Sequence, residues 1–199
     1  MRKLIVFMHM SLDGYVSATD KSANWDGAGS SDLFASVVPQ LIKDADTLLL
    51  GRPLSDELLG YWLKAEATSP GLPKNEIAYA RWATGAKKVI LSRKDEKTAW
   101  PNAEVRKVQD DHSMVQAVTD LKKSPGKDII THGGVRTARD LARLGLVDEY
   151  QLVIQPVILG SGESIFTSVK GQTPLKLKKT EALDGGAIVT TYEPAHPAG

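Results

Sequence analysis

Residues 128–145, DIITHGGVRTARDLARLG, place a short apolar strand, a pair of glycines and an amphipathic helix in direct succession. Ile129 and Ile130 predict a buried strand, and apolar residues recur at helical spacing from Val135 to Leu144. Glycine at such a junction lets a ligand approach the main-chain amides at the start of a helix, where an anion is favoured. A tight turn without a ligand is the alternative explanation of an isolated glycine pair.

The chain on both sides of this segment alternates between predicted strands and predicted helices. We expect strands over 4–10, 47–50, 88–91, 104–108 and 149–159, and a closing hairpin from 175–181 and 187–192. We expect helices over 34–42, 56–61, 77–82 and 114–121, and loops over 14–31 and 64–75. Pro39 predicts a kink or restart of its helix, and Pro156 a bulge or an edge position in its strand. The alternation predicts one α/β domain over 1–199, with a mostly parallel mixed sheet, antiparallel C-terminal strands and a flexible tail over 194–199.

The composition is that of an ordinary globular protein. The chain has 199 residues, of which 42% are hydrophobic and 25% charged, and its net charge is +1. The near-zero charge favours neither nucleic acid nor an acidic membrane as a partner. The absence of cysteine excludes disulfides and cysteine-ligated metals and fits a reducing compartment, so we expect a cytoplasmic protein. No run of residues is long enough to span a membrane, and the four histidines lack metal-ligand spacing, so no metal is expected.

Polar or glycine-rich residues follow four of the predicted strands. They are Ser11-Leu12-Asp13-Gly14, Gly51-Arg52, Ser92-Arg93 and Gly133-Gly134. The carboxyl ends of parallel strands form one edge of a sheet, where ligands bind. Glycines before a helix suit a pyrophosphate, and arginine with serine suits a further phosphate. A ligand with phosphates at two places indicates NADP(H), although the chain has neither a Rossmann GxGxxG nor a Walker A sequence.

The chain resembles the dihydrofolate-reductase-like superfamily, of the type found as the reductase domain of the bifunctional riboflavin-biosynthesis deaminase–reductase. The segments that carry the resemblance are, in family order, MSLDGYVS at 10–17, LLLGRPLSD at 48–56, KVILSR at 88–93 and DIITHGGVRTARDLARLGLVDEYQLVIQPVILGSGESIF at 128–166. The last segment is long and specific, whereas SLDG and LGR are short. The resemblance implies a three-layer α/β/α dihydrofolate-reductase-like fold and a stand-alone member of the family without a deaminase domain.

The same resemblance implies NADPH as the cofactor and hydride transfer to a nitrogen heterocycle or an imine-like carbon. The cofactor-binding residues that it implies are Gly51 and Arg52 for the phosphates, Ser92 and Arg93 for the adenosine 2′-phosphate, Gly133, Gly134, Val135 and Thr137 for the pyrophosphate, and His9 and Val16 for the nicotinamide pocket.

The positions expected to contact phosphate and substrate include one departure from the family. Relatives commonly have threonine three positions after the glycine of LGR, where this chain has Leu54, so phosphate binding there depends on whether Ser55 substitutes. Asp13 lies in a matching motif, and we expect it to contact substrate or act in catalysis; a turn-shaping role is the alternative. Trp25 and Trp62 are candidates to stack on a flat substrate ring, and ordinary core positions are their alternative.

Together these features predict an NADPH-dependent reductase of a pyrimidine- or pterin-like heterocycle, such as 5-amino-6-(5-phosphoribosylamino)uracil in riboflavin biosynthesis. A non-catalytic module that binds NADP(H), a flavin or a folate is the alternative, and reduction of a different carbonyl or imine substrate is a third hypothesis. By resemblance we also expect a homodimer, with the strand 149–159 as a candidate interface.

Overall fold

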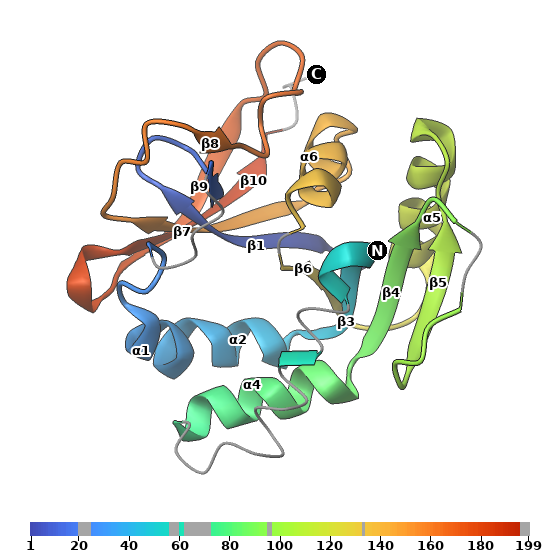
Figure 1. Cartoon of the computed structure of the whole chain (residues 1–199), viewed down its shortest axis with the longest axis horizontal. Coiled ribbons are helices and arrows are strands. Elements are labelled where there is room, and N and C mark those ends of the chain that lie inside the picture. The colour runs from blue at the N-terminus through green and yellow to red at the C-terminus, as the bar shows by residue number, and fades with distance from the viewer. Residues whose placement is uncertain (20–24, 56–59, 62–72, 95–96, 133, 196–199) are drawn as a thin grey trace. The chain divides into compact units, whose positions relative to one another are not determined.

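The structure, a computed structural model, consists of two compact units (Figure 1). It describes residues 1–19, 25–55, 60–61, 73–94, 97–132 and 134–195. Unit 1 comprises residues 1–2 and 31–130, and unit 2 comprises residues 3–30 and 131–199. Each unit has its own strands and its own buried side chains.

Unit 1 is built on four parallel strands in the order β5–β4–β3–β6. Their bounds are Ala103–Lys107 for β5, Lys87–Ser92 for β4, Ala45–Gly51 for β3 and Asp128–Thr131 for β6. β3 and β4 are mainly apolar and almost wholly buried, as parallel strands covered on both faces should be. Strands are thus confirmed at all four places where the sequence predicts them in this part of the chain.

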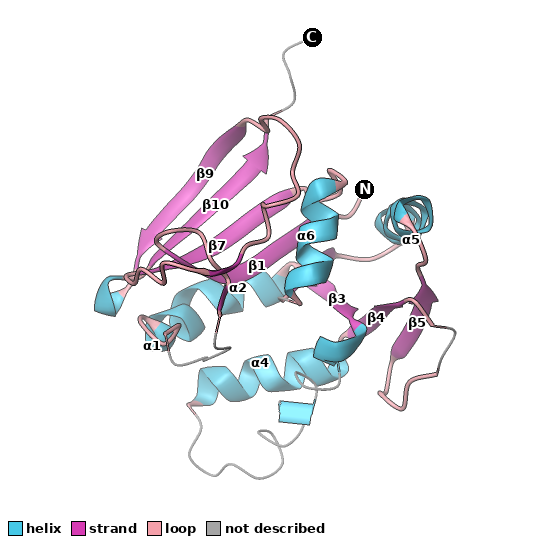
Figure 2. Cartoon of the chain, turned by 45° about the horizontal axis from the view of Figure 1, so that its top comes forward, coloured by secondary structure: helices cyan, strands magenta, loops and turns pink. Residues whose placement is uncertain are grey.

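Helices α4 (Lys74–Gly85) and α5 (Asp111–Lys123) cover the strands of unit 1. Figure 2 shows them on opposite sides of β3, β4 and β5. The Trp82 indole N–H donates to the Ala45 carbonyl at 3.1 Å, which ties α4 to β3. The Arg106 guanidinium donates to the Ala117 carbonyl at 2.7 Å, which ties β5 to α5. The predicted layering of helices on both faces of a sheet is therefore present in unit 1.

The helix restart predicted at Pro39 is confirmed. The helix begins as α1 (Ser30–Asp32), continues as a π-helical segment over Leu33–Val37, and becomes α2 over Val38–Lys43. Pro39 lies in the first turn of α2, directly after the π-helical segment. Most of the helix predicted over 56–61 and of the loop predicted over 64–75 lies outside the described residues.

Unit 2 is built on four strands in the order β1–β7–β10–β9. Their bounds are Leu4–Ser11 for β1, Glu149–Gln155 for β7, Ile188–Pro194 for β10 and Leu175–Ala182 for β9. β1 and β7 are parallel, whereas β10 pairs antiparallel with both β7 and β9. Helix α6 (Val135–Arg143) and a small antiparallel pair, β2 (Ser17–Ala18) with β8 (Gly162–Glu163), complete the unit. Mostly parallel strands with an antiparallel C-terminal end confirm the predicted fold class.

The strand predicted over 149–159 differs from the structure in two ways. β7 ends at Gln155, because Pro156 has no N–H with which to continue the ladder. β7 also pairs with β1 on one side and with β10 on the other, so the edge explanation of Pro156 is wrong. Both hydrogen-bonding edges of β7 are therefore occupied within unit 2, and a second copy of the chain cannot add a strand there.

The C-terminal residues are held further along than the sequence predicts. Pro194 belongs to β10, and the Ala195 N–H donates to the Pro174 carbonyl at 2.8 Å. The first two residues of the expected tail over 194–199 are therefore fixed in unit 2, and residues 196–199 lie outside the described part of the chain.

Candidate functional site

The carboxyl ends of β3 and β4 lie side by side in unit 1. The register pairs Gly51 with Leu91, so Arg52 and Ser92 come next on neighbouring strands, which run about 5 Å apart. Gly51 and Ser92 are buried, Arg52 is half-buried and Arg93 is exposed. The structure thus brings the four predicted cofactor residues of unit 1 to one end of its sheet.

β5 adds to this end a cation that the sequence analysis missed. The register places Lys107, the last residue of β5, opposite Ser92, and the Lys107 side chain is exposed. The sequence shows a lysine near the end of the strand predicted over 104–108, but it does not show that this strand lies beside β4. Arg52, Arg93 and Lys107 together make this end of the sheet positive, which suits a phosphate.

Ser55 does not take the place of the threonine that relatives have at the position of Leu54. Its side chain is wholly buried, and its hydroxyl donates to the Arg52 carbonyl at 2.7 Å. That bond holds the turn after β3 and directs the hydroxyl to the main chain instead of to a ligand. The arginines and Ser92 therefore remain the phosphate-binding candidates of this end.

In unit 2, helix α6 begins directly after Gly134. This residue adopts φ 73° and ψ 75°, a left-handed conformation that costs glycine little. Glycine has no side chain with which to cap the helix, so the amides of the first turn, those of Val135 and Thr137 included, receive no N-cap hydrogen bond. Such a terminus favours an anion. The residues present therefore fit a pyrophosphate; Gly133 itself lies outside the described residues.

His132, immediately before the glycines, is a neutral side chain. Burial, and to a smaller extent the nearby His9, lowers the pKa of His132 to about 3. The residue keeps some exposed surface, but its Nε2 is buried, and its ring meets Phe7 edge-on with the centroids 5.3 Å apart. An imidazole that is neutral at physiological pH does not supply positive charge to a phosphate.

His9 and Val16 flank the SLDG turn in unit 2. The His9 ring is half-buried, and its Nδ1 lies 3.1 Å from Gln155 Nε2. Burial lowers the pKa of His9, while the Asp26 carboxylate acts in the opposite direction. The Val16 N–H donates to the Glu163 carbonyl at 2.8 Å, which holds the main chain of Val16 beside β8.

Asp13 organises the loop after β1. One carboxylate oxygen accepts from the Ser11 hydroxyl at 2.7 Å and from the Leu159 N–H at 3.1 Å, and the other accepts from the Gly160 N–H at 2.7 Å. The Ser11 hydroxyl, followed by the two amides, lowers the pKa of Asp13. The carboxylate is therefore ionised at neutral pH and does not serve as a proton donor. The geometry supports the turn-shaping role, and contact with substrate stays a prediction.

The stacking of the two tryptophans on substrate stays a prediction. Trp25 is half-buried in the turn before α1, and Trp62 lies outside the described residues. Over the ranges that the structure describes, no three His, Asp or Glu side chains gather as a metal site would require. Within those same ranges, no helix has the length and apolar character needed to cross a membrane.

Parallel strands closed by an antiparallel hairpin, with a positive strand end in unit 1 and an uncapped helix in unit 2, define a dihydrofolate-reductase-like α/β protein. The sequence matches the RibD C-terminal domain over residues 2–189, and the chain belongs to that family of reductase domains. It is 28% identical over 191 residues to the uncharacterized protein YyaP of Bacillus subtilis, covering 96% of this chain and 94% of YyaP. It is 27% identical over 199 residues to YwjB of the same organism, covering 96% and 97%.

Solved structures with the same fold are named for riboflavin biosynthesis or for a reductase activity. A Shewanella sp. PV-4 protein named for riboflavin biosynthesis superposes with a TM-score of 0.73 at 20% identity, over 98% of this chain and 99% of that one. The chain also superposes on a Thermotoga maritima protein, diaminohydroxyphosphoribosylaminopyrimidine deaminase/5-amino-6-(5-phosphoribosylamino)uracil reductase. The TM-score is 0.63 and the sequence identity 14%, over 98% of this chain and 57% of that one. A pyrimidine reductase-like protein of Corynebacterium diphtheriae superposes with a TM-score of 0.57 at 18% sequence identity, over 98% of this chain and 92% of that one. At these identities the likeness establishes the fold alone.

Proposed function

We propose that the protein is an NADPH-dependent reductase that delivers a hydride to a pyrimidine- or pterin-like heterocycle. The observation that carries the proposal is the strand register of unit 1, which aligns Arg52, Ser92 and Lys107 at the carboxyl ends of three neighbouring strands. Together with Arg93 they supply the charge that a 2′-phosphate needs. Since NADH lacks this phosphate, the same residues would select NADPH.

The chain's own residues would bind and orient the reactants. NADPH, when bound, would supply the hydride, which would join an electrophilic carbon of the substrate, either in the heterocycle or in an imine attached to it. The uncapped amides at the start of α6, after Gly134, would hold the pyrophosphate. Asp13 is kept ionised by its hydrogen bonds, so we assign the proton that reaches the substrate nitrogen to an ordered water.

The proposed substrate class rests on the family. The Thermotoga relative is named as a 5-amino-6-(5-phosphoribosylamino)uracil reductase. We propose the same compound, or an aminopyrimidine or pterin of similar shape, as the substrate, and a place in riboflavin biosynthesis. We also propose that the protein acts in the cytoplasm as a homodimer.

The double variant Arg52→Ala/Arg93→Ala tests the cofactor assignment. Each lost charge-assisted contact with the 2′-phosphate should weaken binding by about 1–3 kcal/mol. We therefore expect the Kd for NADPH, measured by titration calorimetry, to rise by about tenfold or more, and the Kd for NADH, which lacks the 2′-phosphate, to rise less.

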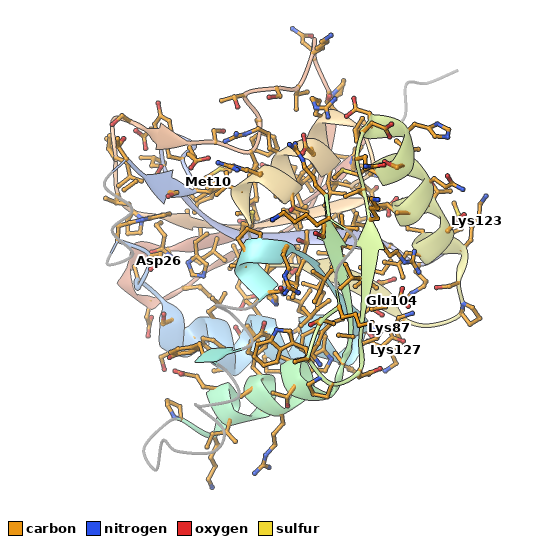
Figure 3. All side chains as sticks on the ribbon, turned by 45° about the vertical axis from the view of Figure 1, so that its right-hand side comes forward. Met10, Asp26, Lys87, Glu104, Lys123 and Lys127 are labelled. Carbon is orange, nitrogen blue, oxygen red and sulfur yellow. The ribbon has the colours of Figure 1, made fainter. Side chains whose placement is uncertain are left out.

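The matched control is Arg81→Ala/Lys123→Ala, which removes the same charge from α4 and α5; Lys123 lies near the end of α5 (Figure 3). This variant should bind NADPH like the parent. If the Arg52/Arg93 variant also bound NADPH like the parent, the phosphate assignment would be wrong. An equal loss in both variants would mean that net charge alone governs binding.

A non-catalytic module for NADP(H), a flavin or a folate is the second candidate function. Two observations favour it: the Asp13 carboxylate is engaged by Ser11, Leu159 and Gly160, and the Ser55 hydroxyl is engaged by the main chain. Oxidation of NADPH in the presence of an aminopyrimidine, a pterin or another carbonyl or imine compound, followed by absorbance, would eliminate this candidate. The compound that supports the reaction would also separate the heterocycle hypothesis from that of a different carbonyl or imine substrate.

A further inference from the structure

Gln155, the last residue of β7, is a buried polar side chain with no role in the predicted site. It is 0% exposed. Its Nε2 donates to the Ala28 carbonyl at 3.3 Å, and its Oε1 accepts from the Ala28 N–H at 3.2 Å. A main-chain N–H can only donate and a carbonyl can only accept, so these two bonds fix which way the carboxamide points.

The fixed carboxamide determines the tautomer of His9. The second hydrogen of Gln155 Nε2 faces His9 Nδ1 across 3.1 Å. Nδ1 must therefore be the acceptor, and the neutral ring carries its proton on Nε2. Burial favours this neutral form, and a hydrogen bond to the main chain of Asp26 holds the ring from the segment before Ala28 (Figure 3 labels Asp26).

The main chain around Ala28 is also packed closely from another direction within unit 2. Gly29 has φ +72°, and a Cβ there would lie 2.9 Å from Leu183 Cβ and 3.1 Å from the Asp184 carbonyl oxygen. A Cβ on Gly185 would in turn lie 3.3 Å from the Gly29 nitrogen. The segment 26–29 thus lies between the turn 183–186 and the Gln155 side chain. Gln155 links Ala28 by hydrogen bonds to the end of β7 and to His9 of β1, in addition to the bond between His9 and the Asp26 main chain.

We propose that Gln155 is a positioning residue for the nicotinamide end of the NADP(H) site. It holds the His9 ring as the Nε2–H tautomer and fixes the Ala28 main chain, so that both are arranged before the nicotinamide binds. This inference rests on the proposed function and on the place at the nicotinamide pocket that the family resemblance implies for His9. Arranging a site in advance increases affinity only for the part of the ligand that touches it. Gln155 should therefore matter for the nicotinamide and not for the adenosine phosphates.

Two variants of Gln155 and one control test this role. Gln155→Leu removes every hydrogen bond of the carboxamide. Gln155→Glu keeps an acceptor for the Ala28 N–H but faces His9 Nδ1 with a carboxylate acceptor, so Nδ1 should gain a proton, as the Nδ1–H tautomer or as the imidazolium. The control is Gln151→Leu, four residues earlier on the same face of β7, whose Nε2 donates to Glu149 Oε1 at 2.9 Å.

The first measurements need no cofactor. Nitrogen chemical shifts should show the Nε2–H tautomer of His9 in the parent and in Gln151→Leu, and a protonated Nδ1 in Gln155→Glu. Hydrogen exchange at the Ala28 amide should be faster by about tenfold or more in Gln155→Leu and unchanged in the control. An Nδ1–H tautomer in the parent, or no change in Gln155→Glu, would overturn the proposal.

The second measurement compares NADPH with 2′-phosphoadenosine diphosphate ribose, which has every phosphate but no nicotinamide. In Gln155→Leu the Kd for NADPH should rise by about tenfold while that for the nicotinamide-free ligand stays within about twofold of the parent. Equal losses would mean a general structural role, and no loss would mean no role; either result would overturn the proposal. If the parent bound neither ligand, the proposed function and the role at the nicotinamide would both be wrong. The tautomer measurements would still show whether Gln155 fixes the tautomer of His9.

Discussion

At the scale of the residue, His132 couples the stability of the fold to pH. Its pKa is about 3 in the folded protein, against 6.5 for an ordinary histidine. Below pH 6.5 the unfolded chain gains a proton at this residue and the folded protein does not, until the pH approaches 3. The free energy of unfolding should therefore fall as the pH drops through this window, by up to about 1.4 kcal/mol per pH unit from His132 alone.

His132→Gln should remove this contribution, so that denaturant titrations between pH 7 and about pH 4 give a shallower fall in the free energy of unfolding. His9, whose pKa is also lowered, acts in the same direction in both proteins. Gln116→Ala on α5, an exposed position without a titratable side chain, is the control and should leave the slope unchanged. An identical slope in His132→Gln and the parent would mean that His132 ionises in the folded state.

At the scale of the element, Gly162 determines whether β2 and β8 can pair. Gly162 has φ +156°, and a Cβ there would collide with the Ser17 carbonyl oxygen on the facing strand. Gly160, two residues earlier, has φ +72° but no neighbour within 4 Å of the place where a Cβ would lie. The pair of glycines separates the effect of backbone strain from the effect of collision.

Gly160→Ala should cost about 1–2 kcal/mol of stability, because an alanine must adopt a left-handed conformation. Gly162→Ala should cost more, since it adds a collision that only movement of β2 or β8 can relieve. Chemical denaturation gives the two losses. Exchange of the Val16 amide, which donates to the Glu163 carbonyl, should quicken in Gly162→Ala and not in Gly160→Ala. Equal losses with equal exchange would show that the approach of the strands plays no part.

At the scale of the whole molecule, cofactor binding should appear as a gain in stability. A ligand that binds only the folded state stabilises it by about 2.7 kcal/mol at a hundred times its Kd. We expect NADPH to raise the melting temperature clearly and NADH at the same concentration to raise it little. Only NADPH carries the 2′-phosphate that the positive strand end of unit 1 would bind. FMN and folate serve as further comparisons. A rise with FMN or folate and none with NADPH would favour the binding module over the reductase.

Most elements of this chain could be predicted from sequence because their signals are local. Continuous apolar runs identify β1, β3, β4 and β6, and helical spacing identifies α5 and α6. The error over 149–159 arose because Pro156 was taken to interrupt a strand that in fact ends before it. The burial of Lys88 could not be predicted from local sequence either. Lys88 lies in a correctly predicted strand and is only 1% exposed. Its ammonium donates to the Thr84, Ala86 and Pro101 carbonyls, which lie on other segments of the chain.

Local patterns of residues were sufficient to predict most elements, the mixed α/β class and the motifs of the RibD C-terminal family, because these depend on residues close together in the chain. Which strands are neighbours could be seen only in the folded chain, and so could the place of Lys107 beside Ser92 and of Gln155 between His9 and Ala28. Residues 9, 28 and 155 meet through the parallel pairing of β1 and β7 and the return of the segment 26–29. Contacts between distant segments depend on how the whole chain buries its apolar surface, and no local pattern of residues records them.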